Sequence, residues 1–125
     1  MQINIKTSGE NQAIVTQLTK KLTGGTKENV IARIALGYSL STGKRFTQQE
    51  FSAYDSQGKE YKDHILFDGQ YRDFYIALIC QAYGITKNDE LIPKYIKLHI
   101  DHGLEKINYC LLYTSDAADD MQCVD

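Results

Sequence analysis

The chain begins with a short stretch in which apolar and polar side chains alternate. Ile3 and Ile5 alternate with Gln2, Asn4 and Lys6, which is the two-residue period of a strand with one buried and one solvated face. A strand of this length does not persist alone in water, so it requires a partner. We expect that partner to be the same strand of a second copy, which would make the stretch an intermolecular ribbon.

Two helical patterns follow the strand and are separated by Gly24-Gly25. The first covers residues 10–22, with Ser8 as its N-cap and glycine supplying the left-handed cap at its end. The second begins at Thr26, the expected N-cap, and runs to Leu40 with apolar residues on two faces, as expected of a central helix in a dimer. The expected apolar positions are Ile14, Leu18 and Leu22, then Val30, Ile31, Ile34 and Tyr38, with Ala32, Leu36 and Leu40.

The second half of the chain continues the helical character after a polar connection at residues 41–58. An extended segment at residues 59–67 is followed by a third helix, expected from about Gly69 to Tyr83 with Asp68 as its cap. A fourth helix is expected from Asp89, with Pro93 in its early turns, where proline is tolerated. The predicted fold is therefore mainly α: a short N-terminal β-strand, two helices, a short extended segment and two further helices.

The end of the chain differs in composition from everything before it. Residues 111–120 continue no apolar periodicity and resemble translated sequencing-adapter read-through, which is excluded from reasoning about the fold; a disordered acidic tail is the alternative. We therefore expect one domain over residues 1–109 and a non-native or disordered tail over 110–125. Cys110 and Cys123 then carry no information, and Cys80 in its apolar pattern indicates a reducing compartment.

The charge distribution points to a polyanionic partner. The whole chain carries -2, yet residues 1–50 carry +4, because seven Lys and Arg oppose Glu10, Glu28 and Glu50, while residues 113–125 carry -4. A basic first half favours nucleic acid, although a solvated surface gives the same pattern. No apolar run approaches the ~20 residues that span a bilayer, and no signal segment opens the chain. The expected location is the cytoplasm, without membrane contact.

The candidate DNA contacts are basic side chains of this first half. Backbone N–H groups around Thr26 and Lys27, at the start of a helix, would suit a DNA phosphate, although plain capping accounts for Thr26 as well. Arg33 also suits helix packing or an intersubunit ion pair, and two adjacent basic residues in a loop are often simply solvated. The candidates are Lys6, Lys20, Lys21, Lys27, Arg33, Lys44 and Arg45.

The order strand, helix, turn, helix resembles the ribbon-helix-helix DNA-binding fold. In that fold two chains pair their first strands and place the ribbon in the major groove. Gln2, Asn4 and Lys6 match the amide and basic side chains that such proteins direct at bases. An edge strand with a solvated face is the plain alternative.

Nothing in the chain marks a catalytic or metal site. His99 and His102 share a helix face, but no third ligand stands at a characteristic spacing, and structural zinc usually has four. The phosphate loop, the dinucleotide fingerprint, the paired-histidine zinc motif and the nucleophile elbow are all missing. We therefore expect no enzymatic activity, no cofactor and no metal.

A longer likeness covers about residues 1–108. It is carried by Ile31-Ala32-Arg33-Ile34-Ala35, by the helix around Phe74–Ile79, and by His99-Ile100-Asp101-His102-Gly103. These segments resemble the DndE family, the small subunit of the bacterial DNA phosphorothioation machinery. The resemblance implies a self-associating helical protein that performs no sulfur chemistry, holds duplex or nicked DNA, and works beside sulfurtransferase and ATPase subunits. It marks no individual lysine.

Three functions are compatible with the sequence. The first is the non-catalytic DNA-binding subunit of a DNA sulfur-modification complex, and the second is a dimeric ribbon-helix-helix regulator of the repressor or antitoxin type. The third is a protein-interaction module without DNA affinity. We favour the first because residues 59–108 form a second helical layer, whereas a minimal repressor ends near Leu40. The first strand then joins subunits, and DNA contacts fall on Lys6 and the helix ends around Gly24-Gly25.

Overall fold

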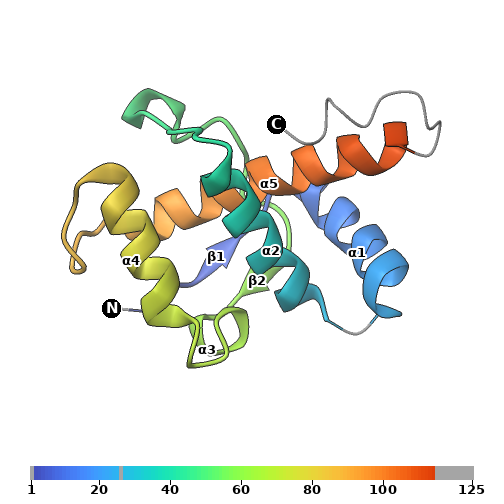
Figure 1. Cartoon of the computed structure of the whole chain (residues 1–125), viewed down its shortest axis with the longest axis horizontal. Helices are drawn as coiled ribbons and strands as arrows, with labels where there is room; N and C mark the ends of the chain where they lie inside the picture. Colours follow the sequence, from blue (N-terminus) through green and yellow to red (C-terminus); the bar gives the residue numbers. More distant parts are fainter. Residues whose placement is uncertain (1, 26, 115–125) are drawn as a thin grey trace.

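The computed structural model describes residues 2–25 and 27–114, with side chains as far as Leu111 (Figure 1). It is mainly helical, as the sequence predicts, with one two-stranded sheet. The elements are β1 (Ile5–Lys6), α1 (Gly9–Thr23), α2 (Glu28–Ser41), the 3-10 helix η1 (Gln48–Glu50), β2 (Glu60–Tyr61), α3 (Asp63–Leu66), α4 (Arg72–Tyr83) and α5 (Ile92–Thr114).

The first strand finds its partner within the chain. β1 pairs antiparallel with β2, with Ile5 opposite Tyr61. Asp63 extends this connection, because its carboxylate accepts the Ile3 N–H at 2.9 Å and its own N–H donates to Asn4 Oδ1 at 3.2 Å. The alternation of buried and exposed side chains is as predicted. The prediction that this strand pairs with a second copy is wrong, because the chain's own second half supplies the hydrogen-bonding edge.

The ends of the first helix follow the predicted capping pattern. Ser8 Oγ accepts the Asn11 N–H at 3.0 Å at the start of α1. Gly24 ends the helix in the left-handed region, at φ 77°, and its N–H donates to the Thr19 carbonyl. Lys27 directly precedes α2, while Thr26, the predicted N-cap, lies outside the described residues.

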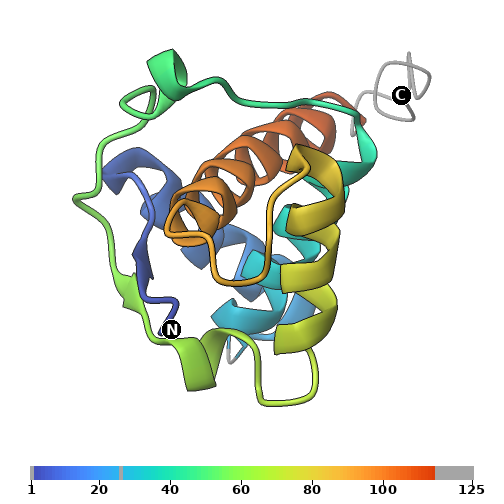
Figure 2. The same cartoon turned by 90° about the vertical axis from the view of Figure 1, so that its left-hand side faces the viewer.

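The core forms where α2 packs along α5, with α1, α3 and α4 around this pair (Figures 1 and 2). α2 is therefore central within a single chain. Two predicted core positions are exposed. Leu22 is 56% exposed, because the last turn of α1 lies away from α5. Ile34 is 51% exposed, because it stands two residues from the buried Ala32 and Leu36 and so faces the other side of α2. The largest fully buried side chains are Phe67, Ile3, Leu18, Ile31, Leu36, Leu66, Ile79, Ile92, Ile96, Leu98, Ile100 and Leu104.

The two later helices begin after their predicted first residues. Asp68 and Gly69 have φ angles of 48° and 72°, and this left-handed turn delays α4 until Arg72. Asp89 accepts the Leu91 N–H at 2.8 Å in the turn before α5, so Pro93 falls in the first turn of that helix. α5 continues through Cys110 to Thr114. Residues 115–125, the main part of the predicted tail, lie outside the described residues.

None of the helices in the described part combines the length with the apolar composition that crossing a bilayer requires.

Candidate nucleic-acid interface

Three exposed lysines lie around the connection between α1 and α2. Lys20 and Lys21 stand in the last turn of α1, and Lys27 precedes α2. In the described part of the chain, no carboxylate forms an ion pair with any of the three. The acid closest in sequence, Glu28, is bonded elsewhere, at 3.4 Å from Lys59 Nζ and 3.2 Å from Tyr61 Oη. We call Lys20, Lys21 and Lys27 the lysine corner.

Lys44 and Arg45 lie just beyond the opposite end of α2. That helix has 14 residues, so roughly 20 Å separates this pair from the lysine corner. Lys44 Nζ lies 3.2 Å from Glu50 Oε2. Arg45 donates to the Lys44 carbonyl at 2.7 Å and to the Ala82 carbonyl at 3.3 Å. Both side chains are thus engaged in contacts within the molecule.

Arg33 connects α2 with the elements that follow β2. Its Nη1 donates to the Leu66 carbonyl at 2.7 Å, and its guanidinium lies 4.6 Å from the centre of the Tyr71 ring. Tyr75 Oη donates to the Arg33 carbonyl at 3.3 Å. This geometry favours the helix-packing role that the sequence left open for Arg33.

Lys6 lies in a third place, beside the start of α5. It lines a cavity of about 230 Å³ together with Lys94 and Lys97. Lys97 is paired with the buried Asp101, while Lys94 lies 5.3 Å from the centre of the Phe51 ring. The sequence reasoning did not include Lys94, although two lysines just after Pro93 were a readable signal of positive charge at this helix start.

A buried polar chain joins α2, α4 and α5. Ser39 Oγ lies 2.7 Å from Nδ1 of both His99 and His102. His99 Nε2 lies 2.6 Å from Tyr83 Oη, which accepts the Phe46 N–H at 2.9 Å. Burial, with the nearby charges of Arg45, His102 and Lys44, lowers the pKa of His99 to about 3. The His99 imidazole is therefore neutral at physiological pH.

Both histidines direct a nitrogen at a hydroxyl group. In residues 2–25 and 27–114, no group of three or more His, Cys, Asp or Glu is arranged to hold a metal ion. Burial and the charges of Lys106 and Lys44 also lower the pKa of His102. The pair thus organises the interface between α2 and α5.

Asp101 forms a second buried polar centre on α5, which the sequence reasoning missed. Its carboxylate is 0% exposed. It accepts the Ser8 N–H at 3.1 Å and Asn11 Nδ2 at 2.9 Å, and it pairs with Lys97. The i, i+4 spacing of Lys97 and Asp101 was a readable signal of this pair. The centre holds the start of α1 against the middle of α5.

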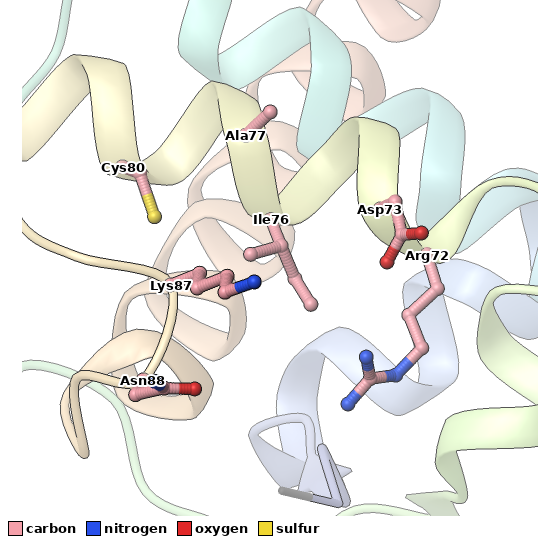
Figure 3. Close-up of a pocket in the computed structure, with 7 residues that line it drawn as sticks. All are labelled: Arg72, Asp73, Ile76, Ala77, Cys80, Lys87 and Asn88. Carbon is pink, nitrogen blue, oxygen red and sulfur yellow. The ribbon is translucent and has the colours of Figure 1, made fainter.

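A further cavity of about 510 Å³ lies between α4 and the turn that precedes α5 (Figure 3). Arg72 and Asp73 stand at one end of it, and Cys80 stands at the other. Arg72 Nε is bonded to Asp63 at 2.9 Å. Within the described residues, the Cys80 thiol is hydrogen-bonded to no base. This cavity therefore provides no evident catalytic pair.

Comparison of the sequence with known proteins identifies the family of the chain. A search of curated proteins gives no match. A family model described as DNA sulphur modification protein DndE matches residues 4–111. That span runs from β1 almost to the end of α5 and includes both buried polar centres. The chain belongs to the DndE family of DNA sulphur modification proteins.

Proposed function

We propose that this protein is a non-catalytic subunit that holds duplex or nicked DNA during sulfur modification in the cytoplasm. Membership of the DndE family links the chain to DNA sulfur modification. The observation that carries the DNA-holding role is the lysine corner, whose exposed side chains have no carboxylate ion pair among the described residues. Such ammonium groups remain available to phosphates.

The chemistry of the lysine corner suits the DNA backbone better than the bases. Lysine ammonium groups contact phosphate oxygens and release condensed counterions, which gives affinity without reading sequence. The first N–H groups of α2 lie beside Lys27 and add partial positive charge at the same place. Sequence-independent binding of this kind suits a subunit of a complex that modifies many sites on DNA.

The two buried polar centres support a role in which this protein performs no catalysis. Polar groups converge on His99 and Asp101, and both of these side chains are 0% exposed. A duplex cannot reach them, whereas the lysine corner is exposed. The sulfur transfer itself is then the task of partner subunits, a sulfurtransferase and an ATPase.

We propose an exposed apolar patch as the contact with protein partners, including a second copy of the chain. The exposed fractions are 51% for Ile34, 51% for Ile65, 37% for Tyr71 and 59% for Phe74. Asn29 donates to the Ile65 carbonyl and Arg33 lies over Tyr71, so the patch follows the seam between α2, α3 and α4. Exposed apolar patches of this kind mark interaction surfaces.

The test of the DNA-holding role is binding of unrelated duplexes, intact and nicked, across a salt series. Lys20→Gln with Lys21→Gln should weaken binding to every duplex and reduce the slope of log affinity against log salt by about 0.9 for each lost contact. The matched control is Lys62→Gln with Lys87→Gln, which removes the same charge from exposed positions elsewhere.

Three outcomes would count against the proposal. Absence of binding to any duplex at low salt would exclude the DNA-holding role. Equal losses in the two double variants would show that overall charge, and not the lysine corner, sets the affinity. Strong preference for one duplex sequence would instead favour a regulator.

A further inference from the structure

A cavity of about 490 Å³ lies between the C-terminal end of α2 and the second half of α5. Its volume falls within the roughly 300–1,000 Å³ that is usual for small-molecule sites. The polar side chains around it are mostly donors of hydrogen bonds or positive charges. They include Thr42, Lys44, His102 and Lys106, with Tyr38 and Tyr109.

The buried polar chain fixes which nitrogen of His102 carries the proton. The Phe46 N–H donates to Tyr83 Oη, and among the described residues the Tyr83 proton has His99 Nε2 as its acceptor. Neutral His99 must then carry its proton on Nδ1 and donate to Ser39 Oγ. The Ser39 hydroxyl in turn donates to His102 Nδ1. Neutral His102 is therefore protonated on Nε2.

The reverse direction of the chain leaves a proton without an acceptor. If Ser39 donated to His99 Nδ1, His99 Nε2–H would have to donate to Tyr83 Oη. That oxygen already accepts the Phe46 N–H, and the Tyr83 hydroxyl proton, on a partly buried side chain, would have no acceptor among the described residues. The fold thus presents His102 Nε2–H as a donor at the cavity.

The charges around His102 are positive. Lys106 stands one helical turn after it on α5, and Lys44 approaches from the segment after α2; both charges act on the imidazole. Lys44 Nζ also lies 3.2 Å from the carboxylate of Glu50. In the part of the chain that the structure describes, Lys106 has no ion pair.

We propose that this cavity binds a phosphate group, held by His102 Nε2–H and by the ammonium group of Lys106, while Lys44 keeps its ion pair with Glu50 and adds positive charge beside them. Charge-assisted donors converging on one point suit a tetrahedral oxyanion. The inference rests on the proposed function only for the source of the group, which is a phosphate of DNA. A free mononucleotide carries the same chemistry, so the two sources require separate experimental arms.

The experiment is nitrogen NMR of the imidazole side chains in the full chain. Inorganic phosphate, adenosine monophosphate and a short duplex are each titrated in, with sodium chloride at equal ionic strength as the reference. Phosphate should shift the His102 Nε2 resonance saturably and leave that of the buried His99 nearly unchanged. It should also raise the midpoint of the His102 titration, because a bound anion favours the imidazolium ion.

Variants at Lys106 separate this site from general charge effects. Lys106→Gln should weaken phosphate binding by at least about tenfold, since a hydrogen bond to a charged group is lost, and Lys106→Arg should restore most of it. Lys87→Gln, at an exposed position outside this cavity, should leave binding unchanged. Both positions are exposed, so these three variants are expected to fold.

The other results of the titrations support or overturn phosphate binding at this cavity as follows. Equal shifts from sodium chloride and from phosphate would overturn the inference. Duplex binding that leaves His102 unperturbed would overturn DNA as the source of the phosphate group, while the proposed DNA-holding function would stand. Binding of phosphate and adenosine monophosphate without any duplex binding would support the cavity and remove the proposed function.

Discussion

Gly103 of α5 lies directly against the backbone of Ala35 in α2. A Cβ atom at position 103 would stand 1.9 Å from the Ala35 carbonyl oxygen and 2.9 Å from its Cα. The two helices therefore approach as closely as they do because position 103 has no side chain. This contact also sets the distance at which Ser39 reaches both His99 and His102.

Replacing Gly103 by alanine should destabilise the fold. The added methyl group would meet backbone atoms, which cannot rotate away as a side chain can, so the helices must separate and their buried contacts loosen. Overpacking typically costs 1–3 kcal/mol, and we expect Gly103→Ala to lower the free energy of unfolding by about 3 kcal/mol. Urea denaturation measures this difference.

Gly37 provides the matched control, because it also lies within a helix. The nearest atom to a Cβ at position 37 is Tyr75 Oη, at 4.0 Å. Gly37→Ala should therefore be neutral or stabilising by about 0.5–1 kcal/mol, the usual gain inside a helix. Similar stabilities for Gly103→Ala and Gly37→Ala would contradict the close crossing of α2 and α5.

Removing the Asp101 carboxylate should be among the most damaging single changes. Asp101→Ala leaves Lys97, whose side chain is 11% exposed, without its carboxylate partner. It also removes the acceptor for Ser8 N–H and leaves Asn11 Nδ2 only its longer bond to the carbonyl of residue 101. Breaking a buried pair in this way costs about 3–5 kcal/mol. Thermal or urea denaturation would show the loss, and Glu90→Ala at an exposed position should stay within about 0.5 kcal/mol of the natural chain.

The free energy of unfolding should decrease as the pH is lowered, because the fold keeps His99 neutral. Burial lowers its pKa from the ordinary 6.5 to about 3. Below about pH 6.5 the imidazole is therefore protonated in the unfolded chain but stays neutral in the folded chain. The stabilisation is fully present above pH 6.5 and is lost as the pH falls from there towards 3. Each such histidine contributes a slope of at most about 1.4 kcal/mol per pH unit. The lowered pKa of His102 acts in the same direction.

The decisive measurement is the slope of the unfolding free energy between about pH 6 and pH 5, where few carboxylates titrate. His99→Gln should reduce this slope by about 1 kcal/mol per pH unit, whatever it does to the stability at neutral pH. His64→Gln removes an exposed imidazole and is the matched control for the loss of one histidine. An unchanged slope in His99→Gln would show that His99 is not held neutral by the fold.

Local features of the fold could be predicted from the sequence because their causes are local. Ser8 caps α1 with its own side chain, Gly24 ends it in the left-handed region, and Ile3 and Ile5 are buried as their alternation indicates. In each case the deciding atoms lie within a few residues of one another. The partner of β1 was not local, since Glu60–Tyr61 stands far along the chain, and the sequence alone did not distinguish it from a second copy.

The candidate site was predictable in its charges but not in its grouping. The sequence indicates seven basic residues, and the structure distributes them over both ends of α2, the start of α5 and the contact of Arg33 with Leu66 and Tyr71. Lys44 and Lys106 line the same cavity because α2 crosses α5 closely. The absence of a side chain at Gly103 permits this close crossing. Ile34 and Leu22 were expected in the core but are exposed. Helical spacing shows which residues share one side of a helix, but it does not show whether another element packs against that side.

Arg33 offers a last prediction, because its contacts separate a packing role from a DNA contact. The guanidinium donates to the Leu66 carbonyl at 2.7 Å and lies on the Tyr71 ring, so Arg33→Ala should lower the free energy of unfolding by about 1–2 kcal/mol. Lys27→Ala, at the exposed lysine corner, should change stability by less than about 0.5 kcal/mol yet weaken duplex binding more than Arg33→Ala does. Urea denaturation and duplex titration on the same two variants test both halves, and the reverse pattern would assign Arg33 to DNA and Lys27 to the fold.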